Sequence, residues 1–188
     1  MNLMIPVNVK ALLTSYLRTF SFIILLGIIS ACTDSIDNHG RSFRMAVRAE
    51  PPTLDWSLAT DSISFNILTN LMEGLTQYNA DLEAVPAVAK RWEFSENGRV
   101  ITFYLRDDVF WSDGKPVTAH DFEYSWKRLL NPATAAQYAY FLFDIENAAE
   151  YNSGKITDPA KVGVRAVTPT VLEVKLKKPV VYFPSIVT

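Results

Sequence analysis

The spacing of hydrophobic residues changes along the chain, and each spacing predicts one kind of element. Between residues 61 and 75, apolar side chains recur at intervals of three and four, which predicts a helix with one buried face. Asp61 or Ser62 is expected to cap its first turn, because either side chain can accept hydrogen bonds from the free amides there. By the same reasoning, further helices are expected over residues 85–91, 118–130 and 135–151.

Alternation of apolar and polar residues predicts strands. Leu172, Val174 and Leu176 alternate with charged residues, which predicts a strand with one buried and one solvated face. The segment Glu96-Asn97-Gly98 predicts a tight turn, because Asn and Gly tolerate a positive φ. Strands are expected over residues 43–49, 92–94, 100–106, 162–167 and 171–177.

Two apolar stretches lie outside this pattern. Residues 179–188 are apolar without a polar cap or a helix stop, which predicts an exposed apolar end and a chain that is a fragment or is cut short. Residues 1–31 begin basic and polar, continue into about ten apolar residues and end on Ser30 and Ala31, as an export signal does. That apolar run is shorter than the roughly twenty residues that cross a bilayer.

Cys32 is the only cysteine, and it follows the expected cleavage point directly. The sequence Ile29-Ser30-Ala31-Cys32 resembles the lipobox of bacterial lipoproteins, in which the cysteine is lipidated and becomes the mature N-terminus. The alternatives are a transmembrane helix or a buried free thiol. A span over residues 11–31 would place Arg18 in lipid, which is costly. Residues 1–31 are therefore interpreted as a lipoprotein signal peptide and Cys32 as the lipidation site.

Residues 32–41 are polar and lack periodicity, so they are expected to form a tether. Their Asp34, Asp37, Asn38 and His39 match no calcium-loop or zinc spacing, so no metal site is expected. The chain carries 18 basic and 20 acidic residues in a mixed order, which gives no argument for nucleic-acid binding.

No nucleophile elbow, Walker loop or dinucleotide fingerprint occurs, and the only histidines are His39 and His120. His120 is interpreted as a solvated residue in the first turn of a helix rather than as a general base. We therefore expect no enzyme and no cofactor.

Several short motifs follow one another from residue 52 onward. They are Pro52-Thr53-Leu54-Asp55, Leu71-Met72-Glu73-Gly74-Leu75, Pro86-Ala87-Val88-Ala89-Lys90-Arg91-Trp92, Thr102-Phe103-Tyr104-Leu105-Arg106, Trp111-Ser112-Asp113-Gly114-Lys115-Pro116-Val117-Thr118-Ala119, Asp121-Phe122-Glu123-Tyr124-Ser125-Trp126-Lys127-Arg128 and Asn131-Pro132. This succession resembles the extracellular solute-binding proteins of family 5, in particular the oligopeptide-binding branch that serves ABC importers.

The resemblance implies an α/β fold that is part of a two-lobed, type II-like periplasmic binding protein, limited to the N-terminal lobe and its inserted small subdomain. Residues 42–188 are expected to form the N-terminal part of the solute-binding domain, with the small subdomain over about 70–170. In the family a peptide is enclosed between two lobes, and its main chain pairs with protein strands. Since the second lobe is outside this sequence, residues 33–188 alone are expected to bind peptide poorly or not at all.

The resemblance also implies ligand-contacting residues, namely Thr60, Asp61 and Ser62 and the aromatic side chain of Tyr138. The alternative is that Asp61 and Ser62 only cap a helix and that Tyr138 only packs. The implied function is delivery of oligopeptides to permease subunits at the periplasmic or extracytoplasmic face of the cell membrane, with the lipid as anchor. A peptide sensor or adhesin of the same fold and an inactive truncated fragment remain alternatives, as do nickel, haem and cell-wall peptides as ligands.

Overall fold

A computed structural model describes residues 44–188. The predicted signal peptide over 1–31, Cys32 and the predicted tether over 32–41 lie outside the described residues. The chain divides into two units, Met1–Ala46 and Val47–Thr188, and every described helix and strand belongs to the second unit. Within residues 44–188, no helix has both the length and the apolar character needed to cross a membrane.

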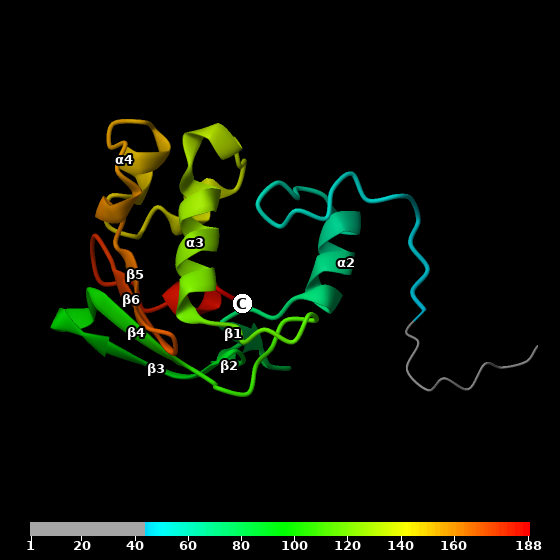
Figure 1. Cartoon of the computed structure of the whole chain (residues 1–188), viewed down its shortest axis with the longest axis horizontal. Coiled ribbons are helices and arrows are strands. Elements are labelled where there is room, and N and C mark those ends of the chain that lie inside the picture. Colours follow the sequence, from blue (N-terminus) through cyan, green and yellow to red (C-terminus); the bar gives the residue numbers. More distant parts are fainter. Residues whose placement is uncertain (1–43) are drawn as a thin grey trace, which may run out of the picture. The chain divides into compact units, whose positions relative to one another are not determined.

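A four-stranded antiparallel sheet forms one side of the second unit, with α3 (Ala119–Leu130) and α4 (Ala148–Asn152) on one of its faces (Figure 1). Its order is β3 (Ala89–Ser95), β4 (Val100–Leu105), β6 (Val171–Lys175) and β5 (Val164–Thr168). Phe103 on β4 pairs with Leu172 on β6, and both are fully buried on the face that carries the core. The predicted alternation over residues 171–177 is confirmed, since Val174 and Leu176 are buried as well.

Helix α3 (Ala119–Leu130) packs on β5 and β6. Its first turn is fixed by Asp121, whose carboxylate accepts hydrogen bonds from the N–H of Thr118 at 2.7 Å and from the Thr118 hydroxyl at 2.9 Å. The helix ends before Pro132, as the sequence predicts. Helix α2 (Ser62–Leu71) is likewise confirmed, with Asp61 as its N-cap, but it ends four residues before the predicted limit.

The helix predicted over residues 85–91 is wrong. This stretch belongs to two strands, β2 (Ala84–Pro86), which pairs with β1 (Thr76–Tyr78), and the beginning of β3. Three consecutive residues, Ala87, Val88 and Ala89, are buried together, so no helical face separates apolar from polar side chains. The N–H of Ala89 donates to the carbonyl of Leu75 at 2.9 Å, so long-range pairing prevails over local helix propensity.

The long helix predicted over residues 135–151 is also wrong. The structure has a 3-10 turn over Ala139–Leu142 and a short helix α4 over Ala148–Asn152. Between them, Ile145 pairs with Leu176, and the N–H of Glu146 donates to the carbonyl of Lys175 at 2.8 Å. Asn147 then adopts a positive φ of 60°. The backbone is thus used to extend the pairing with β6, which a continuous helix would prevent.

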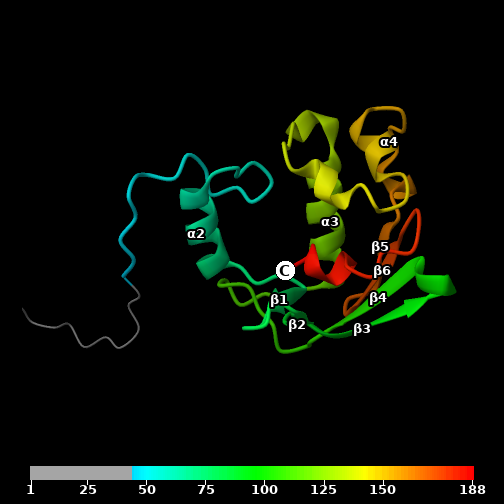
Figure 2. The same cartoon turned by 180° about the vertical axis from the view of Figure 1, so that it is seen from behind.

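Two further expectations change. Residues 44–49 form no strand, and Met45 and Val47 are exposed, so the strand predicted over 43–49 is not found in its described part. The apolar end at residues 179–188 is partly buried, while Val181 and Tyr182 stay exposed as predicted. Val180, Phe183 and Val187 join the core, and the Thr76 hydroxyl donates to the carbonyl of Pro184 at 2.5 Å. Figure 2 shows this red segment between α3 and β1.

Candidate ligand-binding surface

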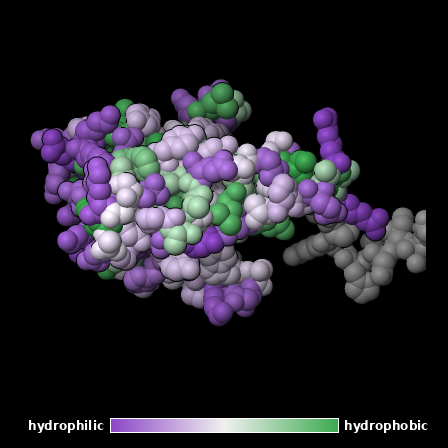
Figure 3. Space-filling model, turned by 90° about the horizontal axis from the view of Figure 1, so that it is seen from above, coloured by the Kyte–Doolittle hydropathy of each residue, from purple (hydrophilic) through white to green (hydrophobic). Residues whose placement is uncertain are grey.

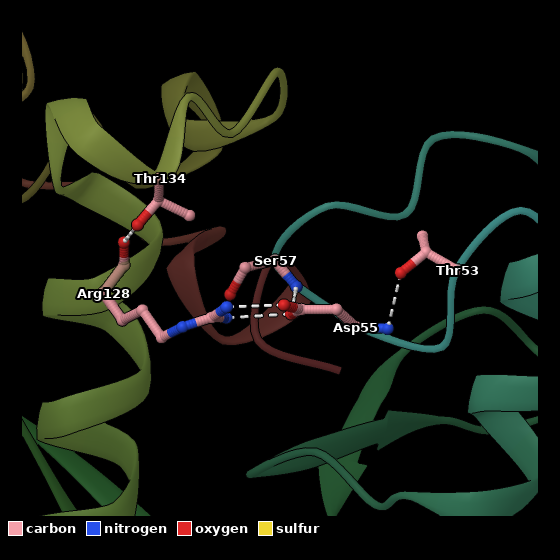
Figure 4. Close-up of polar contacts among 5 residues, drawn as sticks. All are labelled: Thr53, Asp55, Ser57, Arg128 and Thr134. Carbon is pink, nitrogen blue, oxygen red and sulfur yellow. Dashed lines mark hydrogen bonds and ion pairs between the residues drawn. The ribbon is translucent and has the colours of Figure 1, made fainter.

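An ion pair attaches the loop before α2 to helix α3 (Figure 4). The guanidinium of Arg128 donates to both carboxylate oxygens of Asp55, at 2.8 Å and 2.5 Å, in a bidentate arrangement. Asp55 also accepts a hydrogen bond from the N–H of Ser57 at 3.0 Å. The hydrogen bonds from Arg128, above all, hold the pKa of the Asp55 carboxyl below its ordinary value of 3.8.

The loop is shaped locally before it reaches Arg128. The hydroxyl of Thr53 accepts a hydrogen bond from the N–H of Asp55 at 3.0 Å, and the carbonyl of Asp55 accepts hydrogen bonds from the N–H groups of Leu58 and Ala59. These short-range contacts turn the motif Pro52-Thr53-Leu54-Asp55 into a compact bend. The bend presents the Asp55 side chain to α3 and leads directly to residues 60–62.

Asp61 is committed to the first turn of α2. Its carboxylate accepts hydrogen bonds from the N–H groups of Ile63 and Ser64, each at 2.9 Å, and from the Ser64 hydroxyl at 2.7 Å. These bonds, chiefly those from Ser64, lower the pKa of Asp61. A carboxylate with this many partners is a cap, so a ligand would meet the exposed neighbours Thr60 and Ser62 and the main chain rather than the Asp61 side chain.

The structure brings residues 60–62 and Tyr138 together, although 76 residues separate Ser62 from Tyr138 in the sequence. The hydroxyl of Tyr138 donates to the carbonyl of Thr60 at 3.3 Å. The ring of Tyr138 stacks on Phe65 of α2, with centroids 6.1 Å apart and an interplanar angle of 22°. All four predicted ligand-contacting residues therefore lie in one neighbourhood of the molecule.

Four more aromatic residues form a cluster with Tyr138, three of them in contact with its ring. Trp56 contacts Phe65 edge to face at 5.9 Å, and the rings of Tyr140 and Phe141 lie 6.1 Å and 5.7 Å from that of Tyr138. We call these five side chains the aromatic cluster: Trp56, Phe65, Tyr138, Tyr140 and Phe141. Sequence reasoning identified only Tyr138 in a ligand role and placed Phe141 inside a helix, whereas Phe141 is half exposed.

Hydropathy alone does not mark the whole cluster, because tyrosine and tryptophan score as mildly polar and only Phe65 and Phe141 score as hydrophobic. The one face of the molecule in Figure 3 carries hydrophobic residues among hydrophilic ones. The only sequence signal was the succession Tyr138-Ala139-Tyr140-Phe141, in which three of four residues are aromatic. Its partners on the loop and on α2 become visible only in the folded chain.

A separate hollow of about 540 Å³ lies along the outer side of α3 and does not include residues 60–62. It is lined by His120, Glu123, Tyr124, Lys127, Arg128, Asn131, Tyr151 and Pro159. Its acid is already paired, because Glu123 accepts hydrogen bonds from the Lys127 ammonium at 2.5 Å and from the N–H of Ala166 at 2.8 Å. Over residues 44–188, no three His, Cys, Asp or Glu side chains lie close enough together to hold a metal ion.

Comparison with known proteins places the chain, though not this surface as such, in a family. Residues 83–188 match the family described as bacterial extracellular solute-binding proteins, family 5 Middle. The chain is 41% identical over 153 residues to the oligopeptide-binding protein OppA of Bacillus subtilis, a match that covers 80% of this chain and 28% of that protein.

Solved structures agree with this match. The substrate-binding domain of an oligopeptide ABC transporter from Bacillus anthracis is 43% identical, with a TM-score of 0.69 over 73% of this chain and 27% of that one. A Listeria monocytogenes OppA bound to peptide is 37% identical, with a TM-score of 0.71 over 74% of this chain and 27% of that one. The chain thus spans little more than a quarter of the length of these relatives.

Proposed function

This chain belongs to family 5 of the bacterial extracellular solute-binding proteins, and from that premise we propose that it supplies the N-terminal part of a protein that binds oligopeptides and delivers them to an ABC importer. The expected fold class, the α/β N-terminal portion of a periplasmic solute-binding protein, is confirmed by the structural matches. In this proposal residues 42–188 belong to the solute-binding domain, with the small subdomain over about 70–170, and the ligand reaches the protein outside the cytoplasm.

One geometric observation carries the peptide assignment. Residues 60 and 61 lead into α2, and Asp61 has the extended backbone angles φ −115° and ψ 155°. Their carbonyls accept hydrogen bonds from the Tyr138 hydroxyl and from the N–H of Phe65. Within residues 44–188, the N–H groups of Thr60 and Asp61 donate to no other residue. Extended main chain with open donors suits a partner that is itself an extended main chain, because such pairing gives affinity without reading side chains.

The ligand class is tested on the gene product purified from its own cell. The protein is unfolded under mild acid, and the released small molecules are identified by mass spectrometry. We expect a mixture of short peptides of varied sequence. Recovery of haem, nickel or a single non-peptide compound in stoichiometric amount would overturn the peptide assignment.

The requirement of both lobes for peptide binding is tested on residues 33–188 alone. Isothermal titration with mixed tripeptides to pentapeptides should give no measurable heat of binding, because only one side of the proposed clamp is present. The purified whole gene product serves as the positive control. Micromolar affinity in the isolated chain would contradict the two-lobed mode of binding.

Anchoring is a separate part of the proposal. Cys32 is proposed to carry the lipid after removal of residues 1–31, and two or more acyl chains would give stable attachment where one would not. Labelling with a radioactive fatty acid in a bacterial host should mark the wild-type protein, whereas Cys32→Ser should remain unlabelled. An unlabelled wild-type protein would overturn the anchor and leave the peptide assignment untouched.

A further inference from the structure

Tyr138 has little capacity left for a ligand. Its hydroxyl donates to the carbonyl of Thr60, and one face of its ring is stacked on Phe65. The rings of Tyr140 and Phe141 lie against it at 83° and 61°. The contacts around Tyr138 hold the loop, α2 and the 3-10 turn together, so its role is to position its neighbours.

Tyr140 and Phe141 are the open members of the aromatic cluster. Their centroids lie 4.5 Å apart with an interplanar angle of 31°, and their exposed fractions are 53% and 50%. Both rings project from the 3-10 turn Ala139–Leu142, which is anchored by the buried side chains of Ala139 and Leu142. Anchoring at both ends of so short a turn holds the exposed ring pair in place.

We propose that Tyr140 and Phe141 form a side-chain subsite that prefers an aromatic residue of the bound peptide. The inference rests on the proposed peptide-binding function and adds a selective element to it. Tyr138 contacts both rings of the pair and donates to the carbonyl of Thr60, and in this proposal a peptide whose main chain follows residues 60–62 presents a side chain to the pair. A third ring that joins the pair gains edge-to-face or offset stacking beyond its simple burial.

The size of the preference follows from that stacking energy. An aromatic contact of this kind corresponds to about three- to tenfold in affinity. Residues 60–62 supply main-chain pairing to any peptide, so the preference is graded and not absolute. Exposed Tyr124 on the outer side of α3 provides a matched control, since it lies outside the aromatic cluster.

The test uses the whole gene product and isothermal titration with four tripeptides: trialanine and its three variants with one phenylalanine. One phenylalanine peptide should bind about three- to tenfold more tightly than trialanine. In the double variant Tyr140→Leu/Phe141→Leu, which keeps apolar bulk and removes both rings, that ratio should fall to about one. Tyr140→Phe should keep the ratio, and so should the control Tyr124→Leu.

Two results would overturn the subsite: equal affinity for all four peptides, and a preference that survives in the double leucine variant. If the thermal midpoint of that variant also falls, the two rings are assigned to packing. If the wild-type protein binds none of the four peptides and releases no peptide from cells, the proposed function itself fails, which separates that failure from the loss of a preference alone.

Discussion

The body of the second unit and the segment that leads into it are held in different ways. In the body, residues 75–188, the sheet, α3 and the C-terminal run share a hydrophobic core in which Phe103, Leu172 and Phe183 are fully buried. In the segment over residues 47–71, Ala59, Leu68 and the hydroxyl-bearing Ser57 and Ser64 are buried, and helix α2 makes no broad contact with any strand.

Attachment of this segment depends on named contacts. They are the Asp55–Arg128 ion pair, the hydrogen bond from Tyr138 to Thr60 and the stacking of Phe65 on Tyr138. Burial of apolar area is non-directional and cumulative, whereas an ion pair or a ring contact fixes one geometry at a small net gain in stability. The contacts of the body therefore mainly stabilise the fold, whereas those of the segment mainly fix its position, which suits a surface that meets a ligand.

The largest expected effect on stability comes from removing one buried side chain from the core of the body. Phe183→Ala removes a fully buried ring beside Trp126 and should lower the free energy of unfolding by about 3–5 kcal/mol. Urea unfolding followed by circular dichroism measures the change. Val181→Ala, two residues earlier and largely exposed, is the matched control and should change it by less than about 0.5 kcal/mol. Equal effects of the two variants would mean that the C-terminal run does not belong to the core.

Overpacking at Gly74 should lower the free energy of unfolding by less than the loss of the Phe183 ring does. A Cβ added at Gly74 would lie 2.5 Å from the backbone carbon of Thr188, so Gly74→Ala must displace the backbone of residues 187–188. We expect a loss of about 1–3 kcal/mol, the usual cost of overpacking. The exposed neighbour Glu73→Ala is the control and should be nearly neutral. Unchanged stability in Gly74→Ala would show that residues 187–188 do not pack against Gly74 in solution.

Loss of the Asp55–Arg128 ion pair should loosen the segment over residues 47–71 from the body without unfolding the body. Asp55 and Arg128 are each about a third exposed, so Asp55→Asn should lower the free energy of global unfolding by no more than about 1 kcal/mol. Hydrogen exchange should nevertheless quicken over residues 55–71 and stay unchanged over β4 and β6. Arg165→Gln, which breaks the exposed pair with Glu173, is the control and should leave residues 55–71 protected. Uniform loss of protection in Asp55→Asn would refute the distinction.

The same contrast explains what could be predicted from the sequence. Alternation over 171–177 and the helical spacing over 118–130 predicted the correct strand and helix, because such patterns reflect burial that depends on neighbouring residues. The helices expected over 85–91 and 135–151 were wrong, because the backbone in these stretches pairs with residues that are distant in the sequence. Ala89 pairs with Leu75, and Ile145 pairs with Leu176. Local patterns carry no information on such partners.

The candidate surface follows the same rule. The four predicted residues come together, but their neighbours Phe65 and Arg128 come from elements far apart in the sequence and gave no signal. Asp61, which the resemblance suggested as a ligand contact, has its oxygens engaged by the first turn of α2. The resemblance named four residues that the fold places near one another, their ligand role stays a prediction, and only the fold shows which side chains around them are exposed.

The finest test of the comparison is pH, because it acts on the segment through one carboxylate. The pKa of folded Asp55 lies below its ordinary value of 3.8, chiefly because Arg128 donates to it, so the ionised form is favoured by folding. The contribution of this carboxylate to stability is complete at pH well above 3.8 and is lost as the pH falls through the lower folded value.

The amide signal of Ser57, whose N–H donates to Asp55, should report this titration in NMR spectra. We expect a midpoint below 3.8 in the wild type, while Arg128→Gln should raise the midpoint toward 3.8, since it leaves the carboxyl without its cation. The amide of Ser64, which reports Asp61, should titrate alike in both proteins and serves as an internal control. A Ser57 midpoint that is the same in both proteins would mean that the ion pair does not hold the loop against α3.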